Sequence, residues 1–137
     1  MSLDADETDE PSASIRIPPS SAYLATVRAF VGAIGRHCAC SEEAVEDLRL
    51  ATTEACAQAI EDGVATDGID VRAWVLGDRL RMEVEPAGAI GSRSTDRDSD
   101  APPDVRRALI TALDPEATFA DAGGHLVVRL SVPADGR

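Results

Sequence analysis

The chain has no lysine, few aromatic residues and no long apolar run. All 13 of its basic residues are arginine, and they face 25 acidic residues, which gives a formal net charge of −12 over 137 residues. Because this charge repels phosphate backbones and anionic lipid, we expect no direct contact with nucleic acid or membranes. No segment approaches the ~20 apolar residues that cross a bilayer, and the first residues lack the pattern of a signal peptide. The sequence therefore predicts a cytoplasmic protein.

An even set of cysteines, typical of a disulfide framework, is also missing, since the chain has only three. His37, Cys38 and Cys40 form a His-Cys-Ala-Cys cluster, which leaves a thiol or metal sensor open as an alternative function. Only Cys56 and His125 could complete a tetrahedral zinc site, and no second pair has the usual zinc-ligand spacing.

The composition supports one domain with its own core, because 44% of the residues are apolar. Residues 1–14 are acidic and almost free of apolar side chains, so we expect a disordered tail there. The domain is predicted to span residues 15–133, followed by a short C-terminal tail at 134–137. The negative charge favours association with a basic partner, such as a protein that itself binds DNA or RNA polymerase.

Two helices are predicted in the first half of the domain. An extended segment at Ser14–Pro18 precedes a helix that begins at Ser20 or Ser21 and ends near Gly35. A second helix runs from a Ser41 cap to Gly63. The first has an apolar stripe of Tyr23, Leu24, Val27, Val31 and Ile34, and the second has one of Val45, Leu48, Thr52, Ala55 and Ala59.

The second half changes to a period of two. Apolar residues alternate from Ile69 to Val75 and from Leu80 to Val84 around a Gly77-Asp78 turn, which predicts a hairpin. Residues 86–103 form a long polar loop. A third helix is expected from an Asp104 cap to Pro115, with Val105, Ala108, Leu109, Ala112 and Leu113 on its apolar side. Thr118-Phe119, a Gly123-Gly124 turn and Leu126–Val132 complete the domain.

This order predicts an α+β fold, a two-layer sandwich of helices on a mixed, mainly antiparallel sheet. On the second helix, Glu54, Gln58 and Glu61 are spaced i, i+4, i+7 and so lie on one side, next to the apolar stripe.

The segment Glu46–Ile60 resembles the long helix of the anti-sigma factor serine kinases, and the resemblance extends over residues 15 to 133. That family has the histidine-kinase-like ATPase fold shared with gyrase and mismatch-repair ATPases, and its helix reads Glu-Ala-x-x-Asn-Ala. The resemblance implies that Glu54 is the catalytic general base if the protein is an active kinase. Gln58 replaces the asparagine that holds magnesium, and its extra methylene should weaken that metal site.

Other parts of the implied ATP site are degenerate. The family motif Asp-x-Gly-x-Gly matches here only at Gly88, since Pro86 replaces the adenine-binding Asp and Ile90 the second glycine. Glu85 should point to the opposite face of its strand. The following segment, Ser92–Asp104, is acidic and has no glycine where the family has a phosphate lid. Gly124 matches a family glycine near the last strand.

The resemblance implies an anti-sigma factor, a stress-response regulator of transcription that sequesters an alternative RNA polymerase sigma factor until an anti-anti-sigma partner displaces it. The damaged motifs favour a form without kinase activity, for which no cofactor is needed. The alternative is a serine kinase that binds ATP and magnesium and phosphorylates the anti-anti-sigma partner. The family also implies a homodimer, formed through Ile15–Ile17 and the surface of Tyr23–Ile34.

Overall fold

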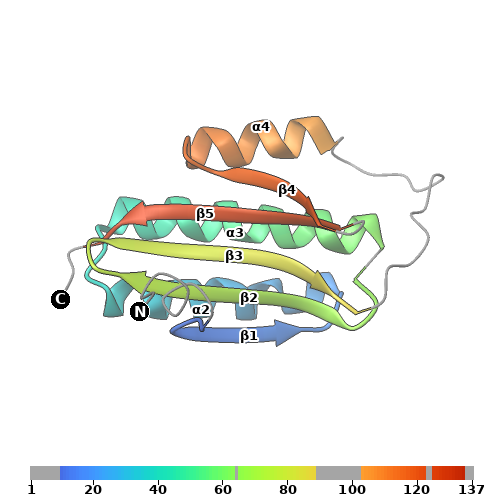
Figure 1. Ribbon diagram of the computed structural model, residues 1–137, viewed down its shortest axis with the longest axis horizontal. Helices are drawn as coiled ribbons and strands as arrows, with labels where there is room; N and C mark the ends of the chain where they lie inside the picture. The colour runs from blue at the N-terminus through green and yellow to red at the C-terminus, as the bar shows by residue number, and fades with distance from the viewer. Residues whose placement is uncertain (1–9, 64, 89–102, 123–124, 135–137) are drawn as a thin grey trace, which may run out of the picture.

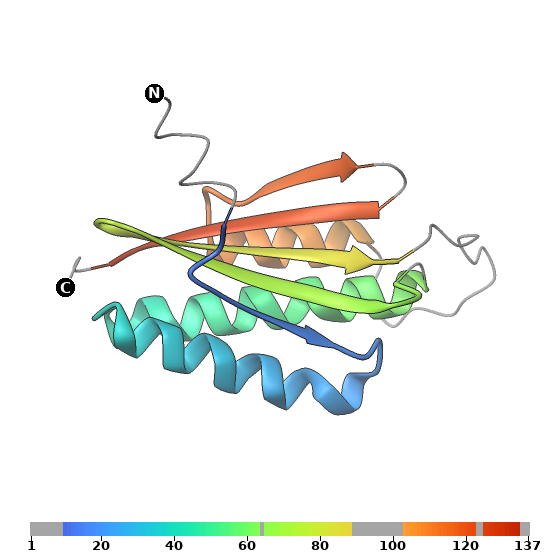
Figure 2. The same cartoon turned by 60° about the horizontal axis from the view of Figure 1, so that its bottom comes forward.

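The computed structural model describes residues 10–63, 65–88, 103–122 and 125–134. Within these ranges, five strands form one sheet and the helices cover one of its faces (Figure 1, Figure 2). None of the described helices is both long and apolar enough to span a membrane. In chain order the elements are β1 (Ala13–Ile17), the 3-10 turn η1 (Ser21–Tyr23), α2 (Leu24–His37), α3 (Glu42–Asp62), β2 (Gly68–Leu76), β3 (Arg79–Ala87), α4 (Pro103–Leu113), β4 (Thr118–Ala122) and β5 (His125–Pro133).

The strands lie in the order β1-β2-β3-β5-β4, and every described pairing is antiparallel. The predicted two-layer α+β fold is confirmed, with a sheet that is antiparallel rather than mixed at these pairings. The predicted hairpin is β2 and β3, which turn at Gly77 (φ 65°) and Asp78. At the first edge, order begins slightly earlier than expected, because Ser12 already donates from its backbone N–H to the Ala73 carbonyl.

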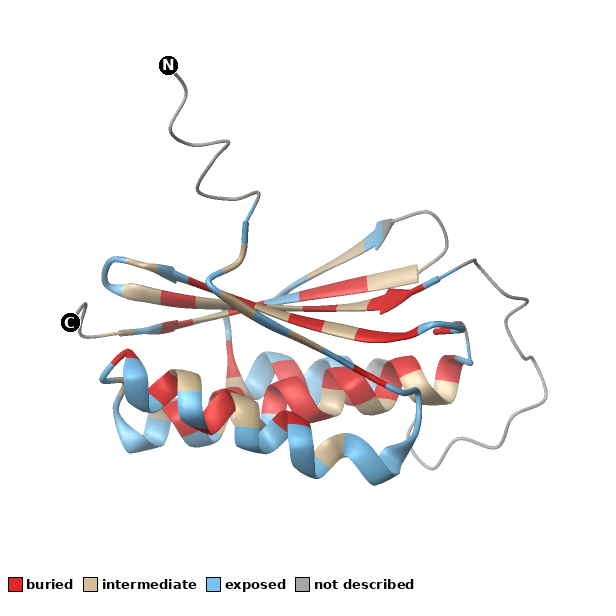
Figure 3. Cartoon of the chain, turned by 90° about the horizontal axis from the view of Figure 1, so that it is seen from below, coloured by how far each residue is buried: buried red, intermediate tan, exposed pale blue. Residues whose placement is uncertain are grey.

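The central helix of the helical layer is α3, and both of its ends are as predicted. The Ser41 hydroxyl accepts a hydrogen bond from the Ala44 N–H at 3.0 Å, and Gly63 ends the helix in the left-handed conformation. Figure 3 shows the buried residues concentrated where the helices meet the sheet. The predicted stripe of α3 lies there, and all five of its members are buried: Val45, Leu48, Thr52, Ala55 and Ala59.

The first helix differs from its prediction at both ends. Ser20 caps the short turn η1, and α2 begins only at Leu24 and continues past Gly35 to His37. Val27 and Val31 are fully buried, as expected from the stripe, whereas Tyr23 is 42% exposed because it lies in η1 rather than on the helix face.

The predicted inner face of the third helix was wrong. The helix α4 begins at Pro103, so Asp104 lies within it rather than capping it. Val105 and Leu109 are 54% and 47% exposed, while Ile110 is buried and Leu113 packs against the core. The helix is therefore rotated relative to the prediction, and it turns Arg106 inward.

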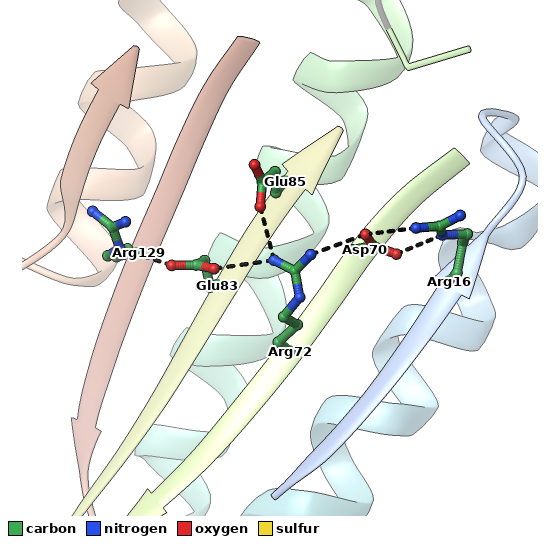
Figure 4. Close-up of polar contacts among 6 residues, drawn as sticks. All are labelled: Arg16, Asp70, Arg72, Glu83, Glu85 and Arg129. Carbon is green, nitrogen blue, oxygen red and sulfur yellow. Dashed lines mark hydrogen bonds and ion pairs between the residues drawn. The ribbon is translucent and has the colours of Figure 1, made fainter. Parts of the chain in front are cut away.

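The sheet face opposite the helices carries a chain of ion pairs (Figure 4). Arg72 on β2 lies at its centre and donates to Asp70, Glu83 and Glu85 at 2.8–3.1 Å. Arg16 on β1 and Arg129 on β5 extend the chain, each at 2.7 Å from its carboxylate partner. Arg16, Arg72 and Arg129 are thus each paired with a carboxylate on a neighbouring strand.

Candidate functional site

The side of α3 that faces α4 carries the polar residues singled out in the sequence. Glu54 and Glu61 are half-buried on this side, and Gln58 is buried. The predicted i, i+4, i+7 alignment is supported by one contact, because a single residue of α4 reaches both glutamates.

That residue is Arg106, whose side chain is only 10% exposed. Its Nη1 donates to Glu54 Oε1 at 2.6 Å, and its Nη2 donates to Glu61 Oε2. A guanidinium carries its donors in a rigid planar fork, so one arginine can hold two carboxylates at fixed positions. The candidate general base is therefore in a charged hydrogen bond with another part of the same chain.

Gln58, the residue at the expected magnesium position, is also bonded within the chain. Its Nε2 donates to Asp62 Oδ1 at 2.9 Å, one turn further along α3. The Gln58 Oε1 atom is buried and accepts no hydrogen bond within the part of the chain that the structure describes. Magnesium needs oxygen ligands in nearly octahedral geometry, and a single buried amide oxygen does not supply them.

The end of β3 carries the residues that the resemblance aligns with the adenine-binding motif. Pro86 is buried and has no side-chain acceptor for an adenine amine, and Glu85 faces the opposite side, where it accepts from Arg72. Gly88 has a φ of 102°, and a Cβ there would lie 2.4 Å from Thr66 Oγ1 and 2.8 Å from the Asp67 N. This glycine is thus required by close packing against the loop that precedes β2.

Some of the predicted site lies outside the described residues. This applies to Gly124, to Ile90 and to the 92–102 part of the candidate lid. His125 begins β5 and is half-buried. Among the described side chains at the implied ATP and magnesium positions, Glu54 and Gln58 are hydrogen-bonded to other residues of the chain, and Pro86 has no side-chain acceptor.

The thiol and metal alternative finds little support. Burial raises the pKa of the Cys56 thiol to about 12 and also raises the pKa values of Cys38 and Cys40. Protonated thiols are poor nucleophiles and poor metal ligands. Within the described ranges, no three His, Cys, Asp or Glu side chains are grouped so that they could hold a metal ion.

Sequence reasoning missed Arg106 as a site residue. The sequence does contain a signal for it, because Arg106, Ile110 and Leu113 also follow the i, i+4, i+7 spacing of a helix face. The inward face of a helix is usually predicted from its apolar residues, and the face with Val105 and Leu109 has more of them. The face with Arg106 turns inward instead, because the two glutamates on α3 pair with this arginine.

Comparison with known proteins gives the same fold. The chain matches a solved structure of the RsbU and RsbW domains of Rv1364c from Mycobacterium tuberculosis with 25% identity and a TM-score of 0.65, over 88% of this chain and 32% of that one. It thus spans about a third of that protein. The structure of the blue-light activated histidine kinase EL346 from Erythrobacter litoralis also matches, with 18% identity and a TM-score of 0.53, over 87% of this chain and 42% of that one. No curated protein sequence matches.

The family model described as the histidine kinase-like ATPase domain matches residues 17–129, from the end of β1 into β5. This range contains α3 with Glu54 and Gln58 and the α4 helix with Arg106. The match to an RsbW domain supports the anti-sigma factor and switch-kinase branch that the Glu46–Ile60 segment indicated. The chain therefore belongs to the histidine kinase-like ATPase domain family.

Proposed function

We propose that this protein is an anti-sigma factor that acts by binding alone. In this proposal it sequesters an alternative RNA polymerase sigma factor, and an anti-anti-sigma partner releases that factor by competition. The family membership and the match to an RsbW domain support a regulatory role for the fold. The partners and the absence of phosphotransfer are the proposed part.

The contact of Arg106 with Glu54 is the observation that carries the proposal. A general base must accept a hydrogen bond from the hydroxyl whose proton it removes. In this chain Glu54 Oε1 already accepts one from Arg106, at 2.6 Å, and the same guanidinium is anchored by Glu61, so the Glu54 carboxylate is held toward α4. Freeing Glu54 would leave a buried arginine with one carboxylate partner fewer, and that change is unfavourable.

Without phosphotransfer, the release of the sigma factor depends on the relative affinities and concentrations of the two partners. Each tenfold difference in affinity corresponds to about 1.4 kcal/mol of binding free energy. The high negative charge of the chain should speed its encounter with a basic partner, and this effect should weaken as salt is added.

The test is a binding and phosphorylation experiment with the full chain. Sigma factors that co-purify from the native cell are identified, and each is then titrated against the purified protein by calorimetry, with and without magnesium and ATP. We expect stoichiometric binding to one sigma factor, an affinity unchanged by nucleotide within about twofold, and no thermal shift with magnesium and ATP.

The variant Glu54→Gln serves as the matched control, because glutamine can still accept the hydrogen bond from Arg106 but cannot act as a base. We expect it to bind the sigma factor as the unmodified protein does. Magnesium-dependent phosphorylation of a partner serine that Glu54→Gln abolishes would establish the kinase alternative. If no sigma factor binds in either form, the proposed partner is wrong.

A further inference from the structure

The acidic residues of this chain are unevenly distributed. Although the chain has 25 of them, none lies between Pro11 and Ser41. That segment includes β1 and α2 and carries Arg16, Arg28 and Arg36. The helix α2 therefore carries arginine and no acidic residue, on a protein with a net charge of −12.

Both arginines of α2 also lack internal partners. Among the arginines that the structure describes, Arg28 and Arg36 are the two with neither an ion pair nor a contact with an aromatic ring. Both side chains are exposed. The other described arginines have such a partner: Arg16, Arg49, Arg72, Arg79, Arg81, Arg106, Arg107 and Arg129.

Both unpaired arginines line a hollow of about 320 Å³ on the outer side of the helix layer. Arg49 of α3 closes its other side, and Gly32 and Ala29 of α2 complete the lining. A Cβ at Gly32 would lie 2.8 Å from Arg49 Nη2 and 3.4 Å from Arg36 Nη1. The glycine thus lets the guanidinium groups of two helices approach each other across the hollow.

Arg49 is only partly neutralised. Its Nη1 donates to Glu46 at 3.1 Å, while its Nε is buried and has no hydrogen-bond partner among the described residues. Together with Arg28 and Arg36, it places three arginines around the hollow, which we call the α2 groove. Guanidinium groups bind carboxylates and phosphates through paired hydrogen bonds.

The α2 arginines of the groove are spread along the helix axis. Arg28 and Arg36 are eight residues apart on one helix, which places them about 12 Å apart along its axis. A segment with several carboxylates can therefore pair with each arginine separately. An extended peptide rises about 3.3 Å per residue, so acidic side chains about four residues apart match the spacing. Nucleic acid also carries repeated charges, but the charge of the whole chain opposes it.

We propose that the α2 groove binds an acidic segment of a partner protein, with carboxylates paired to Arg28 and Arg36. The inference rests on the partner-binding part of the proposed function, but it does not require the partner to be a sigma factor. The groove lies on the outer side of the helix layer, so its occupant need not disturb the Arg106 contact between α3 and α4.

The test uses a fluorescein-labelled peptide of twelve residues with glutamate at every fourth position and serine elsewhere. Binding is followed by fluorescence anisotropy, and amide chemical shifts in NMR spectra locate the contact. We expect salt-dependent binding, with the largest shifts at Gly32 and its neighbours in α2. The double variant Arg28→Ser/Arg36→Ser should lose at least tenfold in affinity.

Arg16→Ser/Arg129→Ser is the matched control, since it removes the same charge from the opposite face of the sheet and should change the affinity less than twofold. Equal losses in the two variants would overturn the proposal, because only net charge would then matter. Equally strong competition by a single-stranded DNA of twelve nucleotides would overturn the choice of a protein ligand. A tenfold gain in peptide affinity on deletion of residues 1–10, which carry five acids, would overturn the choice of a partner protein. It would show that this acidic segment of the chain itself competes for the groove.

Discussion

Arg106, between α3 and α4, and the two arginines on the outer surface of α2 differ in how their charge is paired. Arg106 is buried and bridges Glu54 and Glu61, whereas Arg28 and Arg36 are exposed and form no ion pair with any described residue. The charge of Arg106 is thus paired within the chain, whereas no described carboxylate pairs with Arg28 or Arg36.

The largest predicted effect is the loss of the Arg106 pairing. Arg106→Met should lower the free energy of unfolding by about 3 kcal/mol, because it leaves two half-buried carboxylates close together without a cation. Arg36→Met is the matched control and should change stability by less than about 0.5 kcal/mol. Urea denaturation measures both, and equal losses would show that pairing does not distinguish the two regions.

A smaller effect is expected at the end of β3. Gly88→Ala should cost about 2–3 kcal/mol, since a φ of 102° disfavours alanine and its Cβ would collide with Thr66 and Asp67. Gly63→Ala also has a positive φ but faces open space, so it should cost only about 1 kcal/mol. Thermal unfolding of both variants provides the measurement. Similar costs would mean that close packing is not what requires glycine at position 88.

On the sheet face, Arg72 is paired like Arg106 but is less buried. Arg72→Met should destabilise the protein by about 1 kcal/mol, because Arg72 joins three carboxylates at a side-chain exposure of 27%. The loss should shrink in about 1 M NaCl, which screens exposed charges. Denaturation at low and high salt tests this, and a salt-independent loss would point to apolar packing of the side chain.

The smallest effect concerns a buried group that carries no charge in the folded state. Burial raises the pKa of Cys56 from 9.0 to about 12. Its contribution to stability is complete below pH 9 and is lost as the pH rises toward 12, because the unfolded thiol ionises first. When the pH is raised from neutral to about 9.5, the free energy of unfolding should therefore fall by about 0.8 kcal/mol more in the unmodified protein than in Cys56→Ala. Parallel pH profiles of the two proteins would contradict the burial argument.

The sequence was sufficient for elements whose signals are local. The caps of α3 at Ser41 and Gly63 depend on hydroxyl chemistry and on a left-handed φ, and both were predicted. The alternation around Gly77-Asp78 also predicted the hairpin and which side of β3 Glu85 faces. The replacement of an acidic residue by Pro86 was visible in the same way, since a missing acceptor does not depend on the fold.

The sequence by itself thus determined the order of the elements, the helices on one face of a sheet and the altered residues of the ATP motif. Only the tertiary structure decided which face of α4 turns inward, because the free energy of that choice depends on Glu54 and Glu61, about fifty residues earlier in the chain. The same holds for the α2 groove, where Arg36 and Arg49 belong to different helices. Local periodicity cannot show which charges will find a partner and which will stay open to another molecule.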